Sequence, residues 1–237
     1  MRFDDGCTAL PPHGVLTTRF DAILFDFDGV LLESEYAGNR QIAEFLTAAG
    51  HPTTAEDSMA NFMGLAGADF IAAIERWIGR AVPDGFQAAR EAEDARALAE
   101  GLDAVAGAIA FVASLPDSLP RAIVSSSRTR WLDTHLRHLG IRDCFGSNLY
   151  SGREHVERGK PAPDIYLHAA RELGVDIGRC VILEDSSVGV TGALASGAHV
   201  VGLVAGSHCA PDHAERLRAL GVKDIAASFD EVARLIA

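Results

Sequence analysis

The segment from Phe20 to Val30 constrains the fold more than any other part of the chain. Residues 23–25 form a short apolar run, which is typical of a strand buried in a parallel sheet. Asp26 and Asp28 follow, and Gly29 then interrupts the pattern. Because alternate side chains of an extended chain point the same way, the two acids would share one side at the carboxyl end of the strand, where open α/β sheets bind ligands. Taken alone, the pattern fits a strand ending in an ordinary acidic turn equally well.

The charge balance limits the partners of this protein. The 237 residues include 33 acidic and 21 basic side chains, giving a formal charge of −12. Phosphate backbones are bound by basic faces, so we expect no nucleic-acid partner, and an anionic substrate must meet local cations or a metal. No apolar run reaches membrane-spanning length and the start does not resemble a signal peptide, so we expect a cytoplasmic protein with no membrane partner.

The four cysteines are far apart in the sequence and form no C-x-x-C pair, so they predict neither a disulfide framework nor a zinc site. Residues 1–19, with Pro11-Pro12 and Gly14, predict a flexible N-terminal extension. Residues 34–102 carry helical periodicity only, which predicts a small helical domain inserted into an α/β one. The helices expected there are Ser34–Ala49, Ala55–Phe62, Ala68–Ile78 and Gly85–Ala99.

After residue 102, helices and strands alternate to the end of the chain. The expected helices are Asp103–Leu115, Arg128–Leu139, Ile165–Leu173 and Ser187–Ser196. The expected strands are Arg121–Ser125, Ser147–Tyr150, Cys180–Leu183 and His199–Val204. This alternation predicts an α/β fold, with a Rossmann-like parallel sheet core formed by residues 20–33 and 103–237, helices on both faces, and an inserted all-helical cap domain at 34–102.

Polar residues follow several of the expected strands. They include Asp26 and Asp28, the run Ser125–Ser127, and Glu184-Asp185, while Lys160 precedes a later helix. Parallel strands bring their carboxyl ends to one edge of the sheet, so these residues would meet there. Four acids at one edge repel each other unless a cation is present, which points to a divalent ion with oxygen ligands, most simply Mg²⁺. The lysine and the hydroxyl groups would suit a phosphoryl group.

Four motifs, in order, resemble those of the haloacid-dehalogenase superfamily. They are Asp26-Phe27-Asp28-Gly29-Val30, Ser125, Gly159-Lys160-Pro161-Ala162-Pro163-Asp164 and Leu183-Glu184-Asp185-Ser186. The likeness is greatest to the branch that contains sugar-phosphate phosphatases and β-phosphoglucomutases. It extends from about Phe20 to Val204 and includes the position of the helical cap. A single motif of this kind is a weak signal, whereas four in the right order are strong.

The resemblance implies a role for each motif residue. Asp26 would attack phosphorus and become an aspartyl phosphate, and Asp28 would protonate the leaving alcohol and then deprotonate the attacking water. Lys160 would neutralise charge on the nucleophile and the phosphate. Ser125 and the backbone amide of Ser126 would hold the phosphoryl oxygens. The Mg²⁺ ligands implied are Asp26, the Asp28 carbonyl, Asp185 and, directly or through water, Glu184.

Three further residues are weaker candidates for binding the substrate or its phosphate. Gly29 and Arg128 lie beside motif residues, and Gly64 lies in a glycine-containing cap segment, residues 63–67, whose backbone could approach a substrate. Each has a purely structural alternative. Arg128 could simply begin a solvated helix, and the cap segment could be a turn between two helices.

The residues favour a phosphatase over the alternatives. Because Asp28, Lys160 and Glu184-Asp185 are all present, we do not expect a dehalogenase. The dehalogenases of this superfamily do not keep the second aspartate as an acid/base. A β-phosphoglucomutase offers cations from its cap, and here Met63 and Gly67 stand where those cations would be. We therefore expect a phosphatase acting on a small phosphorylated metabolite, a sugar or sugar acid. A mutase, and more distantly a non-catalytic phosphate-binding protein, are the alternatives, and the sequence leaves the oligomeric state open, with a monomer acceptable.

Overall fold

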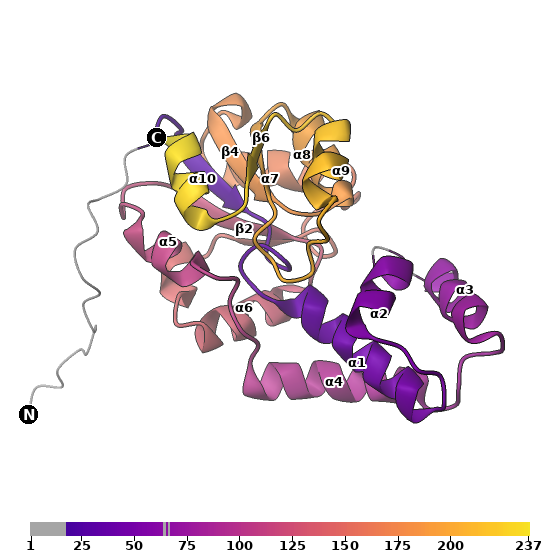
Figure 1. Cartoon of the computed structure of the whole chain (residues 1–237). Helices are drawn as coiled ribbons and strands as arrows, with labels where there is room; N and C mark the ends of the chain where they lie inside the picture. The colour runs from indigo at the N-terminus through magenta and orange to yellow at the C-terminus, as the bar shows by residue number, and fades with distance from the viewer. Residues whose placement is uncertain (1–17, 64, 66) are drawn as a thin grey trace, which may run out of the picture.

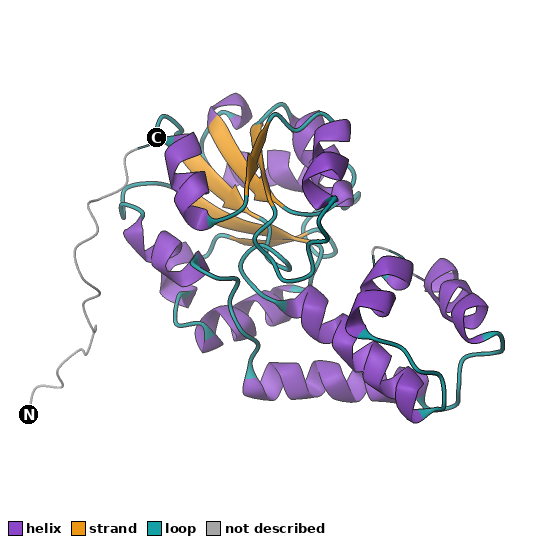
Figure 2. Ribbon diagram, viewed as in Figure 1, coloured by secondary structure: helices purple, strands orange, loops and turns teal. Residues whose placement is uncertain are grey.

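The computed structural model describes residues 18–63, 65 and 67–237, and its centre is a six-stranded parallel sheet (Figures 1 and 2). The strands are β1 (Ala22–Phe25), β2 (Arg121–Ser125), β3 (Leu149–Ser151), β4 (Cys180–Glu184), β5 (His199–Leu203) and β6 (Asp224–Ala226). Their order is β3-β2-β1-β4-β5-β6. Strand β1 therefore lies between β2 and β4, and its carboxyl end is adjacent to theirs.

Helices cover both faces of the sheet. The helices of this unit are α5 (Ala108–Ser114), α6 (Thr129–His138), α7 (Asp164–Leu173), α8 (Ser187–Ser196), α9 (His213–Ala219) and α10 (Phe229–Ile236), with short 3-10 helices at Arg142–Phe145 and Ile177–Arg179. None of the helices in the described part of the chain combines the length and apolar character required to cross a membrane.

Strand β1 shows how the sequence selects the two layers. Ile23 and Phe25 point into a core formed with α5, α6 and α10, whereas Ala22 and Leu24 point into a second core with α7, α8 and α9. Because both faces are covered, all four residues are fully buried, as the unbroken apolar run predicted. The Rossmann-like α/β fold expected from the sequence is thus confirmed.

Four helices form a separate unit between β1 and α5, on one side of the sheet (Figure 1). They are α1 (Ser34–Ala48), α2 (Ala55–Phe62), α3 (Gly67–Ile78) and α4 (Phe86–Glu100). This helical unit has a small core of its own, built on Ile42, Leu46, Phe62, Ile74 and Phe86. It contacts the α/β unit where α4 packs on α6. Its all-helical content is as expected from the sequence.

The start of α5 was predicted wrongly. The sequence predicted a helix from Asp103, whereas α5 begins at Ala108. Residues 103–105 instead pair with the chain that follows β1: Glu33 N–H donates to the Asp103 carbonyl at 2.9 Å, and Val105 N–H donates to the Leu31 carbonyl at 3.0 Å. These bonds between the two connections to the helical unit replace the first turn of the expected helix. Strand β3 is also displaced by up to two residues, to Leu149–Ser151.

The predicted N-terminal extension, residues 1–19, lies mostly outside the described residues. Its last two residues are described, and both contact the C-terminal helix. Thr18 Oγ1 donates to the Ile236 carbonyl at 2.8 Å, and Arg19 N–H donates to the same carbonyl at 3.1 Å. The ordered core therefore begins at least two residues before the boundary expected at Phe20.

His135 is a buried, ionisable residue on the face of α6 that packs on the sheet. Its ring is fully buried, lies 4.1 Å from that of Trp131, and neither ring nitrogen has a hydrogen-bond partner in the described residues. Burial lowers the pKa of His135 to about 4. As the pH falls from 6.5 to 4, the unfolded chain binds a proton on this imidazole before the folded protein does, so the free energy of unfolding should decrease over this range.

We predict that His135→Leu loses less stability than the wild type over this pH range, because the variant has no buried imidazole to protonate on unfolding. Urea unfolding at a series of pH values measures the effect. His138→Leu, on the same helix but exposed, should keep the wild-type pH dependence. An unchanged pH slope in His135→Leu would contradict the prediction.

Candidate active site

The carboxyl ends of β1, β2 and β4 carry the polar residues singled out from the sequence. Asp26 and Asp28 follow β1, Ser125 ends β2, Glu184 ends β4 and Asp185 follows it. Pairing of Phe25 with both Ile123 and Leu183 aligns these three strand ends. Lys160 comes to the same edge from the loop before α7. Residues more than a hundred positions apart in the sequence are therefore in direct contact.

Lys160 is the cation at the centre of this cluster. Its Nζ atom donates to Asp26 Oδ1 at 2.5 Å and to Glu184 Oε1 at 2.6 Å, and its side chain is only 3% exposed. Tyr166, also fully buried, donates its hydroxyl to Glu184 Oε1 at 2.9 Å. Because both charges are buried, solvent screens the attraction between them only weakly.

The buried acids and their basic neighbours shift one another's pKa values. Burial raises the pKa of Asp26 well above its ordinary range; Lys160 opposes this, whereas Glu184 and Asp185 add to it. Burial also raises the pKa of Asp185. Burial disfavours the charged form of Lys160, but its contacts with Asp26 and Glu184 outweigh this and raise its pKa well above 10.5. Lys160 therefore pairs with two of the three buried carboxyl groups, Asp26 and Glu184, whereas His208 pairs with the third, Asp185.

The cluster has the donor set of a site for a hard divalent cation. Oxygen atoms of Asp26, Glu184 and Asp185 lie within 4.8 Å of one another. Asp185 Oδ1 is buried and has no hydrogen-bond partner in the described residues, so it is the carboxylate oxygen left for a cation. Glu184 differs, because Lys160 and Tyr166 occupy its Oε1 atom and the Ser186 N–H and hydroxyl occupy Oε2. Direct contact with a cation therefore suits Asp26 and Asp185 better than Glu184.

Asp28 is held by hydrogen bonds from three parts of the chain. Ser34 Oγ, at the start of α1, and Trp131 Nε1, in α6, donate to Oδ1 at 2.7 and 3.0 Å. The hydroxyls of Ser127 and Ser125 donate to Oδ2 at 2.6 and 3.3 Å. These four donors fix the carboxylate beside the nucleophile candidate Asp26. Sequence reasoning singled out Ser125 but not the roles of Ser34, Ser127 and Trp131.

The weaker candidates lie in different surroundings. Gly29 has a φ of 83°, and a Cβ atom there would lie 2.2 Å from Asp185 Oδ2, so its observed contribution is to leave room for that carboxylate. Arg128 is largely exposed at the start of α6, with its guanidinium 3.8 Å from Glu154. Gly64 lies outside the described residues.

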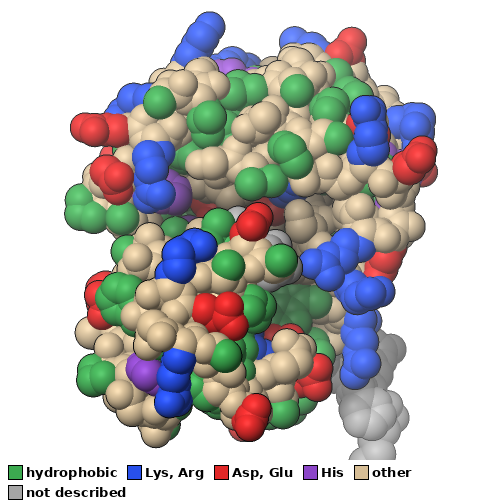
Figure 3. Space-filling view, turned by 90° about the vertical axis from the view of Figure 1, so that its right-hand side faces the viewer, with side chains coloured by type: hydrophobic (Ala, Val, Ile, Leu, Met, Phe, Trp, Pro, Cys, Tyr) green, Lys and Arg blue, Asp and Glu red, His purple; other side chains and the backbone are tan. Residues whose placement is uncertain are grey.

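A cleft of about 1030 Å³ lies between the α/β unit and the helical unit. Figure 3 shows this side of the molecule, with a recess between the larger body above and the helices below and with Lys and Arg side chains gathered beside it. The candidates lining it are Asp26, Asp28, Ser125, Ser126, Arg128, Lys160 and Asp185. Glu35 and Arg90 line it from the helical unit. A cleft of this size holds a small metabolite.

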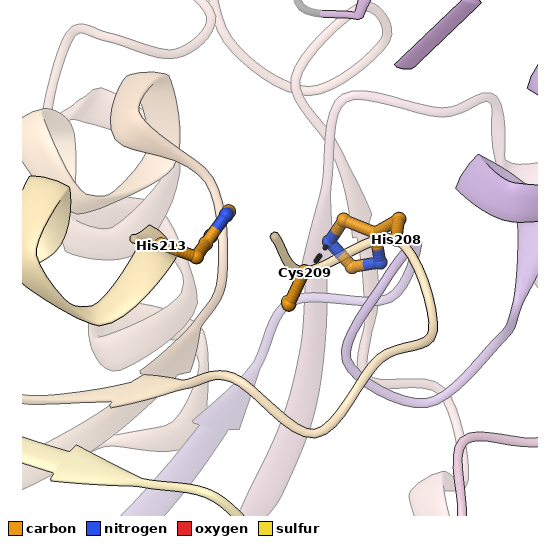
Figure 4. A group of neighbouring side chains, drawn as sticks. All are labelled: His208, Cys209 and His213. Carbon is orange, nitrogen blue, oxygen red and sulfur yellow. Dashed lines mark hydrogen bonds between the residues drawn. The ribbon is translucent and has the colours of Figure 1, made fainter. Parts of the chain in front are cut away.

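Two cleft features were missed from the sequence. Glu35, in the first turn of α1, has a pKa raised to about 7 by burial and by the charges of Asp28 and Asp185. His208, in the loop after β5, contacts Asp185 and is shown with its neighbours Cys209 and His213 in Figure 4. The rule that polar residues follow strand ends could have directed attention to this loop, because β5 is the next strand beyond β4.

Comparison with known proteins identifies relatives of this arrangement. The model of the haloacid dehalogenase-like hydrolases matches residues 20–197. A 6-phosphogluconate phosphatase of Escherichia coli is 26% identical over 82% of this chain and 87% of its own length. A fructose-1-phosphate phosphatase of the same species is 31% identical over 77% of this chain and 96% of its own. A HAD family hydrolase from Deinococcus radiodurans, solved with bound phosphate and sodium, has 32% identity and a TM-score of 0.81, covering 93% of this chain and 99% of that one.

We predict that Lys160→Met destabilises the metal-free protein by about 3–5 kcal/mol at pH 8, because it leaves buried carboxylates without their cation. The raised pKa of Asp26 means that its protonated form is favoured on folding, so stability is lost as pH rises through that pKa. The deficit should therefore be smaller at pH 5 than at pH 8, because lower pH favours the protonated form of Asp26. Denaturant unfolding with a chelator present measures both values.

The exposed Lys223 supplies the matched control, since Lys223→Met removes the same charge from the surface. That variant should change stability by less than about 0.5 kcal/mol at either pH. A deficit in Lys160→Met that does not depend on pH would show that lost packing, rather than uncompensated charge, causes it.

Proposed function

This chain belongs to the haloacid dehalogenase-like hydrolase family, and we propose that it is a Mg²⁺-dependent phosphatase. Its substrate in this proposal is a small phosphorylated metabolite of the cytoplasm, a sugar phosphate or sugar-acid phosphate. The relatives named as phosphatases of 6-phosphogluconate and fructose 1-phosphate support this class of substrate. The proposal depends chiefly on one observation: Asp26, paired with Lys160, and the unpartnered oxygen of Asp185 meet at the floor of the cleft.

Asp26 is the proposed nucleophile. Lys160 contacts Oδ1, while no donor among the described residues contacts Oδ2. In the first step Asp26 forms a bond to phosphorus, the bond from phosphorus to the leaving oxygen breaks, and Asp28 gives that oxygen a proton. In the second step Asp28 takes a proton from water, the water oxygen attacks phosphorus, and inorganic phosphate leaves with Asp26 restored.

The surrounding groups stabilise charge during both steps. In the proposal Lys160 neutralises Asp26, and Ser125 with the backbone amide of Ser126 binds the phosphoryl oxygens. Asp26, the Asp28 carbonyl and Asp185 would hold Mg²⁺, with Glu184 supporting the site through Lys160. When bound, Mg²⁺ supplies positive charge that offsets the charge on the transferring phosphoryl group.

The helical unit, residues 34–102, is the proposed cap that determines which substrates enter. It lines the cleft from the side opposite the catalytic residues, and the segment that contains Gly64 follows α2 in the sequence. Residues 20–33 and 103–237 form the proposed catalytic core. Loops that approach a substrate on such a scaffold are where specificity is usually set.

We predict that Asp26→Asn lowers the hydrolysis of p-nitrophenyl phosphate by at least about 10³-fold, because an amide cannot form the acyl phosphate. Release of p-nitrophenol with Mg²⁺ present measures the loss, and chelation of the metal should abolish wild-type activity. Asp21→Asn is the matched control. Asp21 lies at the opposite end of β1 and pairs with Arg179 on the surface, so this variant should retain wild-type turnover. Equal turnover by Asp26→Asn and the wild type would rule out Asp26 as nucleophile.

Arg90 is the residue that favours the mutase alternative. It lines the cleft from α4, 5.9 Å above the ring of Phe70 and with Nη1 3.5 Å from the Gly38 carbonyl. It is a cation in the cap that could meet a second anionic group on a bisphosphate or a sugar acid. Interconversion of β-glucose 1-phosphate and glucose 6-phosphate with little phosphate released would establish the mutase instead of the phosphatase.

Glu35 is the proposed contact for a substrate hydroxyl near the scissile bond. It lines the cleft in the same region as Asp28, and no donor in the described residues contacts its carboxylate. Above its pKa of about 7, the Glu35 carboxylate can accept a hydrogen bond from a hydroxyl of a sugar or sugar acid. The aromatic leaving group of p-nitrophenyl phosphate has no such hydroxyl.

We predict that Glu35→Gln lowers kcat/KM for fructose 1-phosphate or 6-phosphogluconate by about 10- to 100-fold, which corresponds to one hydrogen bond to a charged group. Hydrolysis of p-nitrophenyl phosphate by the same variant should stay within about threefold of wild type. Steady-state kinetics on both substrate types provide the comparison. An equal loss on both would assign Glu35 to the chemistry rather than to substrate recognition.

A further inference from the structure

The loop between β5 and α9 places an imidazole ring against the acidic cluster. His208 Nε2 lies 2.8 Å from Asp185 Oδ2, and the two side chains are 2% and 3% exposed. His213, the first residue of α9, has its Nε2 atom 2.6 Å from the Asp185 carbonyl oxygen. Figure 4 shows His208 and His213 on either side of Cys209. Neither histidine belongs to the four sequence motifs.

Two glycines leave the space that this contact requires. A Cβ atom at Gly29 would lie 2.2 Å from Asp185 Oδ2 and 2.9 Å from His208 Cε1. A Cβ atom at Gly206 would lie 2.5 Å from the same ring carbon. Such separations are shorter than carbon atoms tolerate, so the ring and the carboxylate fill the space beside both glycines. The orientation of the pair is therefore fixed by packing as well as by the hydrogen bond.

The two carboxylate oxygens of Asp185 therefore have different surroundings. His208 occupies Oδ2, whereas Oδ1 is buried without a partner in the described residues. We propose that His208 is a positioning residue that holds Asp185 in the orientation in which Oδ1 can bind the divalent cation. This inference rests on the metal site of the proposed function. Hydrogen-bonded neighbours of this kind orient metal ligands, and their loss costs about 10- to 100-fold in metal affinity.

A transition-metal site made by the cluster itself is a different possibility. Donor atoms of His208, Cys209 and His213 lie within 4.8 Å of one another. However, the Nε2 atoms of both histidines already contact Asp185, one its side chain and the other its backbone carbonyl. Cys209 lies 3.5 Å from the same His208 nitrogen and makes no contact with Asp185 that the structure records. The cluster is therefore better suited to support Asp185 than to bind a metal itself. Substitution of Cys209 distinguishes these two possibilities, because only a metal site in the cluster would use its thiol.

The test compares His208→Gln with His208→Asn. The amide of glutamine reaches about as far as the Nε2 atom of histidine and can donate to Asp185 Oδ2, whereas the shorter asparagine cannot. Binding of Mg²⁺ by calorimetry, and of Mn²⁺ by electron paramagnetic resonance, is measured on the full-length wild type and variants. We expect His208→Asn to bind either ion about 10- to 100-fold more weakly, and His208→Gln to stay within about fivefold of wild type.

A steady-state readout separates positioning from direct participation. The Mg²⁺ concentration for half-maximal hydrolysis of p-nitrophenyl phosphate should rise in His208→Asn, while kcat at saturating Mg²⁺ should change by less than about threefold. Cys209→Ser is the control, and it should bind Mg²⁺ as the wild type does. Weakening in Cys209→Ser equal to that in His208→Asn would assign the ions to the cluster and overturn the proposal.

The remaining outcomes are also decisive. Equal affinities of His208→Asn, His208→Gln and wild type would show that His208 does not position the metal ligand, with the proposed function intact. Absence of Mg²⁺ and Mn²⁺ binding by the wild-type protein would overturn both this inference and the proposed cofactor. Phosphatase activity that persists after complete chelation of divalent ions would likewise overturn both.

Discussion

The buried contact of Lys160 with Asp26 and Glu184 is the interaction on which the arrangement of the sheet edge depends. Three carboxyl groups, which follow or end two strands, lie in a volume from which solvent is largely excluded. Lys160 contacts two of them and His208 contacts the third. Burying like charges together is costly unless a counter-charge is fixed among them. The packing of Tyr166 and Ser186 around Glu184 holds that counter-charge in place. The Mg²⁺ of the proposed function would add further positive charge at this edge.

The sheet supplies this edge through its strand order rather than through any local sequence. Strand β1 lies between β2 and β4, so the acids after β1 meet Ser125 on one side and Asp185 on the other. Asp28 then connects the two units of the molecule. It accepts hydrogen bonds from Ser34, where the helical unit begins, and from Trp131 on the helix against which α4 packs. A shift of the helical unit would therefore alter the surroundings of the proposed acid/base.

Most of the residues that the structure brings together at the candidate site were singled out from the sequence, because polar residues directly after an apolar strand form a recognisable pattern. The period-two alternation identified Asp26 and Asp28, and apolar runs followed by polar residues identified Ser125 and Asp185. The same reasoning overlooked His208, which lies five residues past the end of β5 rather than directly after it. It also missed Trp131, since an aromatic residue within an amphipathic helix has the pattern of ordinary core packing. Contacts between elements distant in sequence have no local pattern to reveal them.

The chain by itself determined the α/β class, the position of the helical insertion and the identity of the acids and the lysine. Those follow from local periodicity and from residue chemistry, which do not depend on distant neighbours. Tertiary structure alone decided how each carboxylate is used. Glu184 has both oxygens occupied by protein donors, whereas His208 contacts Oδ2 of Asp185 and no donor in the described part of the chain contacts its Oδ1. Such differences arise from desolvation and from hydrogen bonds between residues as far apart in sequence as Asp26 and Lys160, 134 positions, which only the folded arrangement of the strands brings together.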